Sequence, residues 1–150
     1  MITFKTLEIS DIDAITAMMQ DFYAIDNYPI EAEATKKMFY EFIFNEHSGK
    51  AWLIYADNEI AGYVILTYIF SFEYGGKIAF VDELFIKESA RGKGIGKETI
   101  QFIQKESSKL SLKLLYLEVE DHNENAQKLY LANKFEFHNR KLMKFSVKES

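Results

Sequence analysis

The feature that most constrains the fold is the run Tyr63-Val64-Ile65-Leu66, which is apolar at every position. Because consecutive side chains of a strand point to opposite faces, such a strand is apolar on both faces and lies inside a sheet covered on both sides. The polar turn Asp57-Asn58-Glu59 separates the wider strand-like segment 60–69 from another at 51–56, a pattern typical of a β-hairpin. The sequence therefore predicts a buried sheet with antiparallel pairing.

Helical and strand-like periods alternate over the rest of the chain and give the order β-α-α-β-β-β-α-β-α-β. The succession of strand, helix and strand over residues 77–120 predicts a parallel pair joined by a right-handed crossover. We therefore predict one mixed α/β domain over residues 1–150. Besides the hairpin, the expected strands are residues 2–7, 77–86, 114–120 and 135–145. The expected helices are residues 11–24, a segment containing Thr35 to Ile43, residues 95–110 and residues 123–133. Ser10 is the expected N-cap of the first helix, and Asn133 is the expected left-handed residue at the end of the last.

Composition and charge exclude several classes of protein. The chain has no cysteine, which excludes disulfides and thiolate metal sites, and its histidines, His47, His122 and His138, lack metal-ligand spacing. A net charge of −5 disfavours nucleic acid and mildly favours cationic ligands. No apolar segment approaches the ~20 residues of a membrane span. The first residues lack the apolar core of a signal peptide. We expect a cytoplasmic protein with no metal, nucleic-acid or membrane partner.

The most informative segment is residues 81–97, where a strand runs into a glycine-rich turn that opens a helix. The first amides of a helix have no intrahelical acceptors, and the helix dipole places partial positive charge there. Glycines let backbone N–H groups approach a phosphate closely, and cationic side chains add charge. The turn supplies three glycines, Gly92, Gly94 and Gly96, and three cationic side chains, Arg91, Lys93 and Lys97. The pattern predicts a diphosphate site.

Two common phosphate loops do not match this turn. A Walker A loop would need Gly at position 91 and Ser or Thr at position 98, where the chain has Arg91 and Glu98. A dinucleotide fingerprint fails at Lys97 or at Thr99, where its last glycine would stand. The ligand is therefore neither a nucleoside triphosphate held in that way nor a dinucleotide.

The turn resembles the phosphate loop of the GNAT superfamily of acetyl-CoA-dependent N-acetyltransferases, Arg/Gln-x-x-Gly-x-Gly/Ala, which Arg91, Gly94 and Gly96 match in full. The preceding strand, residues 82–86, and the downstream motif Asn123-x-x-Ala126-x-x-Leu129-Tyr130 also agree with the family. The resemblance extends to the order of elements over nearly the whole chain. It departs at Lys134-Phe135, where the family usually has Gly-Phe.

The resemblance implies a GNAT-like fold in which two splayed parallel central strands, here 80–86 and 114–120, hold acetyl-CoA as cosubstrate. Backbone groups near Leu84 and Ile86 would pair with the pantetheine amides, and the Leu84 N–H would stabilise the developing oxyanion. The pyrophosphate would lie on residues 91–97, and Asn123 would reach the pantetheine from the other side. The implied binding residues are Leu84, Phe85, Ile86, Arg91, Gly92, Lys93, Gly94, Ile95, Gly96, Lys97, Asn123 and Tyr130.

The resemblance also implies catalytic roles. Tyr130 would protonate the departing thiolate, as a positioned phenol can. The attacking amine must first lose a proton, because about 1 in 2,500 alkyl amines is neutral at pH 7. Glu83 and Asp82 are the candidate bases, and strand alternation would let only one of them point into the cleft. The sequence leaves that choice open, with a preference for Glu83.

Three hypotheses remain for what the chain does. It transfers acetyl from acetyl-CoA to a small-molecule amine, it modifies a protein lysine or N-terminus, or it is a silent CoA-binding regulatory module; a homodimer is a further expectation from the family. The acidic balance fits both kinds of acceptor. Residues that would shape an acceptor pocket, or else are ordinary core and surface positions, are Asp21, Tyr23, Asp26, Tyr28, Glu31, Phe39 and Phe70.

Overall fold

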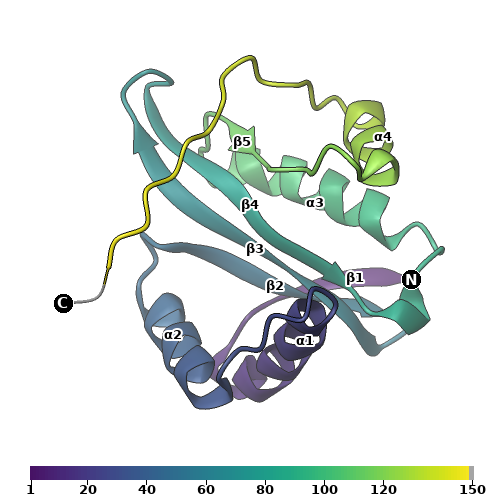
Figure 1. The fold of residues 1–150 in the computed structure, drawn as a ribbon. Helices are drawn as coiled ribbons and strands as arrows, with labels where there is room; N and C mark the ends of the chain where they lie inside the picture. Colours follow the sequence, from purple (N-terminus) through teal and green to yellow (C-terminus); the bar gives the residue numbers. More distant parts are fainter. Residues whose placement is uncertain (149–150) are drawn as a thin grey trace.

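The computed structural model describes residues 1–148 of the chain. These residues fold into a mixed five-stranded sheet with helices on both faces (Figure 1). No helix in this part is long and apolar enough to span a membrane. The strands lie in the order β1-β2-β3-β4-β5, with β4 and β5 parallel and the other neighbours antiparallel, as predicted. Along the chain the elements are β1 Ile2–Thr6, α1 Ile12–Ala24, α2 Ala32–Phe44, β2 Gly49–Ala56, β3 Glu59–Ser71, β4 Gly76–Ile86, α3 Ile95–Lys109, β5 Leu115–Tyr116 and α4 Glu124–Ala132.

The two faces of the sheet bury different cores, because neighbouring residues of a strand point to opposite sides. Helices α1 and α2 cover one face, where Ile15 and Phe39 belong to the same buried cluster as Leu53 of β2. Helix α3, with α4 beside it, covers the other face, where Ile100 clusters with Val64 of β3. This arrangement confirms the sheet covered on both sides.

Strand β3 is the strand that the sequence predicts to be apolar on both faces. Residues 63–66 are between 0 and 5% exposed, and β3 pairs antiparallel with β2 and with β4. The turn before it places Asp57 and Asn58 at φ 51° and 69°, the left-handed conformation that a tight hairpin turn uses. The predicted hairpin is confirmed.

Strands β4 and β5 run side by side for only two residue pairs, Ala79 with Leu115 and Phe80 with Tyr116. Residues 117–120 then leave the sheet, so the expected strand 114–120 is shorter than predicted. The side-chain amide of Gln127 on α4 donates to the carbonyls of residues 120 and 121 at 2.9 and 3.0 Å and holds this segment away. Within residues 1–148, positions 81–86 of β4 therefore have no strand neighbour on that side, and the implied splay is confirmed.

The expected strand at residues 135–145 is wrong, since no strand follows α4 among residues 1–148. A β5 of two residues offers almost no edge for another strand to pair with. The segment instead runs toward the β3–β4 hairpin (Figure 1). There Arg140 donates two hydrogen bonds to the Glu73 carboxylate, at 2.8 and 2.6 Å.

Two helix caps differ from the expectation. Ser10 lies inside a short 3-10 turn, Ile9–Asp11, and Asp11 is the N-cap of α1. The Asp11 carboxylate makes no cap bond to α1; it accepts from the Glu8 amide at 2.9 Å and so closes the 3-10 turn, which shifts the start of α1 past Ser10. At the end of α4 the left-handed residue is Lys134, with φ 73°, and not Asn133. Asn133 keeps negative φ because its side-chain nitrogen donates to the Leu129 carbonyl at 2.7 Å.

Gly62 in β3 lies so close to β4 that a Cβ would stand 2.0 Å from the Phe85 carbonyl oxygen. Gly62→Ala is expected to lower the free energy of unfolding by about 2–3 kcal/mol, because overpacking forces the backbone to shift. Gly96→Ala is the matched control, since its Cβ would meet the Leu129 side chain at an ordinary 3.5 Å. Urea denaturation compares the two, and equal stability would contradict this close approach of the strands.

Candidate functional site

A β-bulge in β4 sets the geometry of the site. Across the β3–β4 ladder, Glu83 pairs with Ile65 while Val81 pairs with the next residue, Leu66. Asp82 is therefore an extra residue in β4 with no partner of its own in β3. An extra residue of this kind bends the strand and changes the direction of the side chains around it.

The bulge brings the two candidate bases to the same side of the sheet. In a regular strand, Ala79 and Phe85 would point to the same face, because they are an even number of residues apart. Here Ala79, before the bulge, packs in the cluster under α3, whereas Phe85, after the bulge, packs under α1 and α2. Asp82 and Glu83 consequently line the same two cavities. The expectation that strand alternation admits only one of them to the cleft is wrong, because the bulge interrupts the alternation.

Glu83 is held by two phenols. The hydroxyl of Tyr23, from α1, donates to Oε2 at 2.6 Å, and the hydroxyl of Tyr63, from β3, donates to Oε1 at 2.7 Å. Tyr63 is fully buried, and its ring lies tilted by 40° against the Phe85 ring, with centroids 5.7 Å apart. Each carboxylate oxygen thus has a charge-assisted hydrogen bond that fixes its position.

The surroundings shift the protonation of both acids. Burial, the largest effect, raises the pKa of Glu83, the hydrogen bonds from Tyr23 and Tyr63 lower it, and the charge of Asp82 raises it again, so that the net direction is upward. Burial, followed by the charge of Glu118, raises the pKa of Asp82. Burial and the Glu83 carboxylate raise the pKa of Tyr23 and Tyr63, so both phenols stay protonated as donors. Acids with raised pKa exchange protons closer to neutral pH than ordinary carboxyls do.

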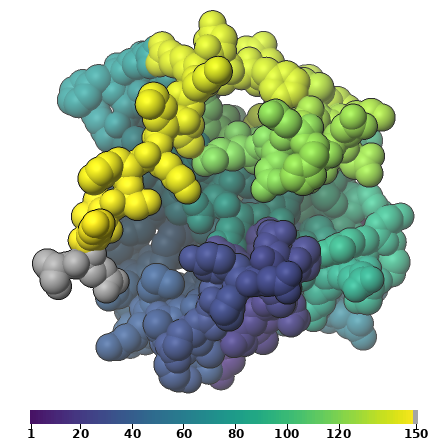
Figure 2. All heavy atoms as spheres, viewed as in Figure 1, coloured from purple at the N-terminus to yellow at the C-terminus, as the bar shows by residue number. Residues whose placement is uncertain are grey.

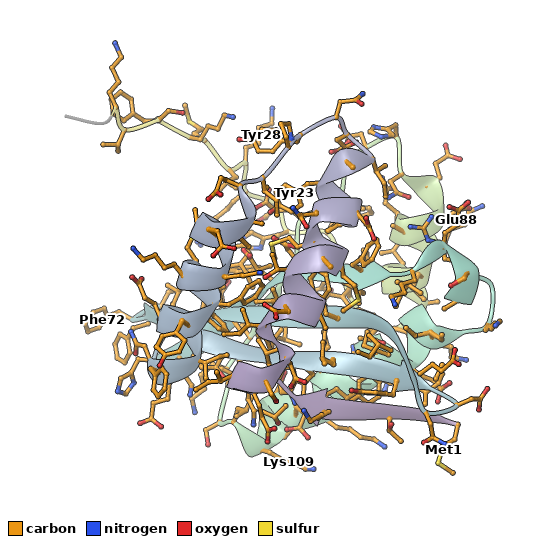
Figure 3. The ribbon with its side chains drawn as sticks, turned by 90° about the horizontal axis from the view of Figure 1, so that it is seen from below. Met1, Tyr23, Tyr28, Phe72, Glu88 and Lys109 are labelled. Atoms are coloured by element: carbon orange, nitrogen blue, oxygen red, sulfur yellow. The ribbon has the colours of Figure 1, made fainter. Side chains whose placement is uncertain are left out.

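A cavity of about 490 Å³ lies over the two acids; we call it the aromatic cavity. The rings of Tyr23 and Tyr28 are 5.9 Å apart where α1 ends (Figure 3). The surface is hollowed between α1 and α4, with teal atoms of the sheet at the floor of the hollow (Figure 2). The residues that line the aromatic cavity are Phe22, Tyr23, Asp26, Tyr28, Asp82 and Glu83.

A second cavity, of about 190 Å³, adjoins the first and shares Tyr23, Asp82 and Glu83 with it. It extends between the helices and β3, and we call it the apolar cavity. Its distinctive walls are the side chains of Met19, Met38, Phe39 and Phe42. The two cavities together place a pair of carboxylates between an aromatic surface and an apolar surface of methionine and phenylalanine side chains.

The turn after β4 presents unpaired amides. Among residues 1–148, the N–H groups of positions 92–97 donate to no backbone or side-chain acceptor, and the first helical bond of α3 runs from Glu98 to the Gly94 carbonyl at 3.1 Å. Gly92 and Gly94 have φ of 79° and 77°, which favours glycine, and a Cβ on either would meet nothing within 4 Å. Bare amides at a helix N-terminus are a ready anion site.

Arg91 stands at the mouth of this turn. Its Nε donates to the Ile86 carbonyl at 3.1 Å, which anchors the side chain on the last residue of β4. The terminal nitrogens of its guanidinium remain available for a bidentate contact with a phosphate. Lys93 and Lys97 are exposed on the same turn and add positive charge.

The open edge of β4 presents backbone groups to the gap left by β5. The Lys87 amide donates to the Ala61 carbonyl of β3, so the odd-numbered positions after the bulge face β3. By alternation, the backbone groups of Leu84 and Ile86 face the gap, whereas those of Phe85 face β3. The structure thus places Leu84 and Ile86 at the edge and turns Phe85 into the core under α1.

Helix α4 borders the gap on its other side. The Asn123 side-chain oxygen caps α4 by accepting from the Ala126 amide at 3.2 Å, which leaves its side-chain nitrogen free to donate. Tyr130 packs edge-on against Phe135, with centroids 5.9 Å apart, and lines a cavity of about 100 Å³ together with Leu117 and others. Burial raises the pKa of Tyr130, so its phenol stays protonated.

Several sequence-predicted acceptor residues meet at the site, and others do not. Tyr23, Asp26, Tyr28 and Phe39 line the two cavities, as the acceptor hypothesis requires. The others lie elsewhere: Asp21 and Phe70 line neither cavity, and Glu31 caps α2 by accepting two amides. Sequence reasoning missed Tyr63, whose signal was the one hydroxyl within the apolar run 63–66. It also missed Glu118, whose charge helps to raise the pKa of Asp82.

Comparison with known proteins places the chain among acetyltransferases. Residues 13–137 match the model of the acetyltransferase (GNAT) family. A D-amino-acid N-acetyltransferase of Saccharomyces cerevisiae is 24% identical over 134 residues, which cover 86% of this chain and 81% of the relative.

Solved structures agree with this match. An integron cassette protein from the mobile metagenome of Cole Harbour Salt Marsh superposes with a TM-score of 0.87 at 28% identity, covering 98% of this chain and 91% of its own. A protein from Clostridium acetobutylicum described as a predicted acetyltransferase, solved with acetyl-CoA, gives a TM-score of 0.78 at 12% identity over 97% of this chain and 96% of its own.

The Tyr23 hydrogen bond favours the charged form of Glu83, so its removal should raise the Glu83 pKa. Tyr23→Phe is expected to raise the Glu83 pKa further, because the charged carboxylate loses a hydrogen bond of a kind that contributes ~1.5–3 kcal/mol. Carbon-detected NMR titration of the Glu83 carboxyl measures this directly. Tyr55→Phe is the control, since Tyr55 packs on the same face without contacting Glu83. A Glu83 pKa unchanged by Tyr23→Phe would contradict the network.

Proposed function

Because the chain belongs to the acetyltransferase (GNAT) family, we propose that it transfers the acetyl group of acetyl-CoA to the primary amine of a small molecule, by direct attack in a ternary complex. The observation that carries the proposal is the run of unpaired amides at residues 92–97, next to the open edge of β4. One end of this surface suits a diphosphate and the other suits an extended amide chain. A coenzyme with both parts fits the whole of it.

The residues present fit that coenzyme. The amides of the 92–97 turn and the guanidinium of Arg91 would hold the pyrophosphate. The edge groups of Leu84 and Ile86 would pair with the pantetheine amides as a further strand does, and the Asn123 side-chain nitrogen would donate from the opposite side. The bound coenzyme supplies an activated acetyl thioester. The Leu84 N–H would stabilise negative charge developing on the thioester oxygen.

Glu83 is the base in this proposal. The acceptor amine binds as an ammonium and must lose one proton before its nitrogen forms a bond to the acetyl carbon. The raised pKa of Glu83 makes it a better proton acceptor than an ordinary carboxylate, and the Tyr23 and Tyr63 hydroxyls keep it oriented. Asp82, beside it in the same cavities, adds negative charge that attracts the ammonium.

Tyr130 is the acid. When the carbon–nitrogen bond forms, the nitrogen carries one proton too many and releases it to solvent. As the carbon–sulfur bond breaks, the leaving thiolate takes a proton. A phenol kept protonated by burial can give that proton at neutral pH, and the donor later recovers it from solvent. Tyr130 and Leu84 pack on the same core cluster under α3, which sets the donor near the edge that would hold the thioester.

Thiol release from acetyl-CoA across a panel of acceptors tests the function. The panel contains arylalkylamines, diamines, amino sugars, a lysine peptide and a free N-terminal peptide. The yeast relative is named for D-amino acids, so both enantiomers of phenylalanine belong in it. Rapid release with a small amine and slow release with both peptides is expected. Faster release with a peptide would favour a protein acceptor, and release with none would favour a silent CoA-binding module.

Arg91→Glu is expected to weaken CoA binding by about 10²-fold, because each charge-assisted hydrogen bond contributes ~1.5–3 kcal/mol. The change in unfolding free energy should stay within about 0.5 kcal/mol, because the side chain is exposed. Isothermal titration calorimetry with CoA measures the affinity. Lys105→Glu, an equal loss of positive charge on the exposed side of α3, is the control. Equal affinities for the two variants would refute the phosphate assignment.

Tyr130→Phe is expected to lower kcat by about 10²-fold while leaving the KM for acetyl-CoA nearly unchanged, since only the proton donor is lost. Stability should change little, because the Tyr130 hydroxyl makes no hydrogen bond within residues 1–148. Steady-state kinetics with the best acceptor of the panel gives both constants. A variant that works at full rate would reduce Tyr130 to a packing residue.

A further inference from the structure

The charges around the two acceptor cavities are of one sign. Asp26, Asp82 and Glu83 line the aromatic cavity, and the latter two also line the apolar cavity. Among residues 1–148, no Lys, Arg or His lines either of them. A ligand inside therefore meets carboxylates, aromatic faces and aliphatic walls, and no cationic side chain.

Few hydrogen-bond donors remain for a ligand. The hydroxyls of Tyr23 and Tyr63 already donate to Glu83. The hydroxyl of Thr35 donates to the Glu31 carbonyl at 2.9 Å. The side-chain hydroxyls left along the walls are those of Tyr28 and Thr67. A carboxylate group in either cavity would lose water and gain too few donors to compensate.

We propose that the acceptor is a primary amine on an uncharged, apolar arylalkyl chain, with no carboxylate on the carbon that bears the amine. This inference rests on the proposed function and names the substrate class of the same site. The ammonium lies against Asp82 and Glu83, in the cavity that the aromatic rings of Phe22, Tyr23 and Tyr28 also line, and aromatic rings attract a cation. The chain and ring enter the apolar cavity.

The apolar cavity suits such a group in size and lining. Its volume of about 190 Å³ holds a single ring with a short chain, and Met19, Met38, Phe39 and Phe42 provide apolar and polarisable contacts. Met38 is 61% exposed, so burying it under a ligand adds to binding. Such an acceptor brings no second anion to the carboxylates of the site.

Three ligands with the same ring and chain test the charge requirement. They are 2-phenylethylamine, phenylalanine in both enantiomers, and phenylalaninamide, in which the carboxylate is replaced by a neutral amide. With acetyl-CoA, kcat/KM for 2-phenylethylamine is expected to exceed that for either phenylalanine by at least about tenfold, the ratio that ~1.4 kcal/mol of repulsion gives. The kcat/KM for phenylalaninamide should lie within about threefold of that for 2-phenylethylamine, because phenylalaninamide has the bulk of phenylalanine but lacks its negative charge.

Charge reversal at the rim of the aromatic cavity sharpens the test. Asp26→Lys is expected to reduce the preference for 2-phenylethylamine over phenylalanine by about threefold or more, because it brings a cation to the carboxylate. Asp21→Lys makes the same change of charge on exposed α1, away from both cavities, and should leave the ratio unchanged. Neither residue belongs to the proposed catalytic machinery.

Each result decides the inference. Equal kcat/KM for phenylalanine and 2-phenylethylamine would overturn the inference while leaving the proposed function intact. A kcat/KM for phenylalaninamide as low as that for phenylalanine would also overturn it, because bulk and not charge would then explain the difference. Calorimetric titration of the same ligands onto the CoA complex judges the cavity without turnover. The same order of affinity would support the inference even if no acetyl transfer occurred, and a reversed order would overturn it.

Discussion

The separation of β4 from β5 is the constraint on which the rest of the molecule depends. The strands share two residue pairs and then part, so the backbone of β4 beyond Phe80 has polar groups that no neighbouring strand satisfies within residues 1–148. Exposed strand edges are costly unless something pairs with them. Here the unpaired edge leads directly into the unpaired amides of residues 92–97. The edge and the turn therefore form one continuous surface of hydrogen-bond donors and acceptors for an extended, anionic ligand.

The β-bulge links that surface to the acceptor side. By adding Asp82 to β4, it turns Leu84 toward α3 and Glu83 toward α1, so the backbone that would hold a thioester and the carboxylate that would receive a proton belong to adjacent residues. The two phenols on Glu83 then come from β3 and α1, which ties the position of the base to both layers of the fold. Packing and chemistry at this point depend on the same few contacts.

Local patterns in the sequence predicted the hairpin, the helices and the glycine-rich turn that opens α3, because each rests on residues close together in the chain. Contacts distant in sequence were not predictable. The bulge at Asp82 exists only in the register with Ile65 and Leu66, and the hydrogen bond from Tyr63 crosses 20 positions. The strand expected at residues 135–145 failed for the same reason, because β5 is too short to pair with it. A pattern shows what a segment can form, and its neighbours decide what it does form.

The most direct test of the central claim is amide hydrogen exchange at Ile86, followed by NMR with and without saturating CoA. Ala79 serves as the internal reference, because its amide already donates to the Leu114 carbonyl at 3.0 Å. If the open edge of β4 binds the pantetheine arm, exchange at Ile86 slows by at least about tenfold on binding, as protection by one added hydrogen bond predicts, while Ala79 changes little. An unchanged rate at Ile86 with CoA fully bound would contradict this role for the separated strands.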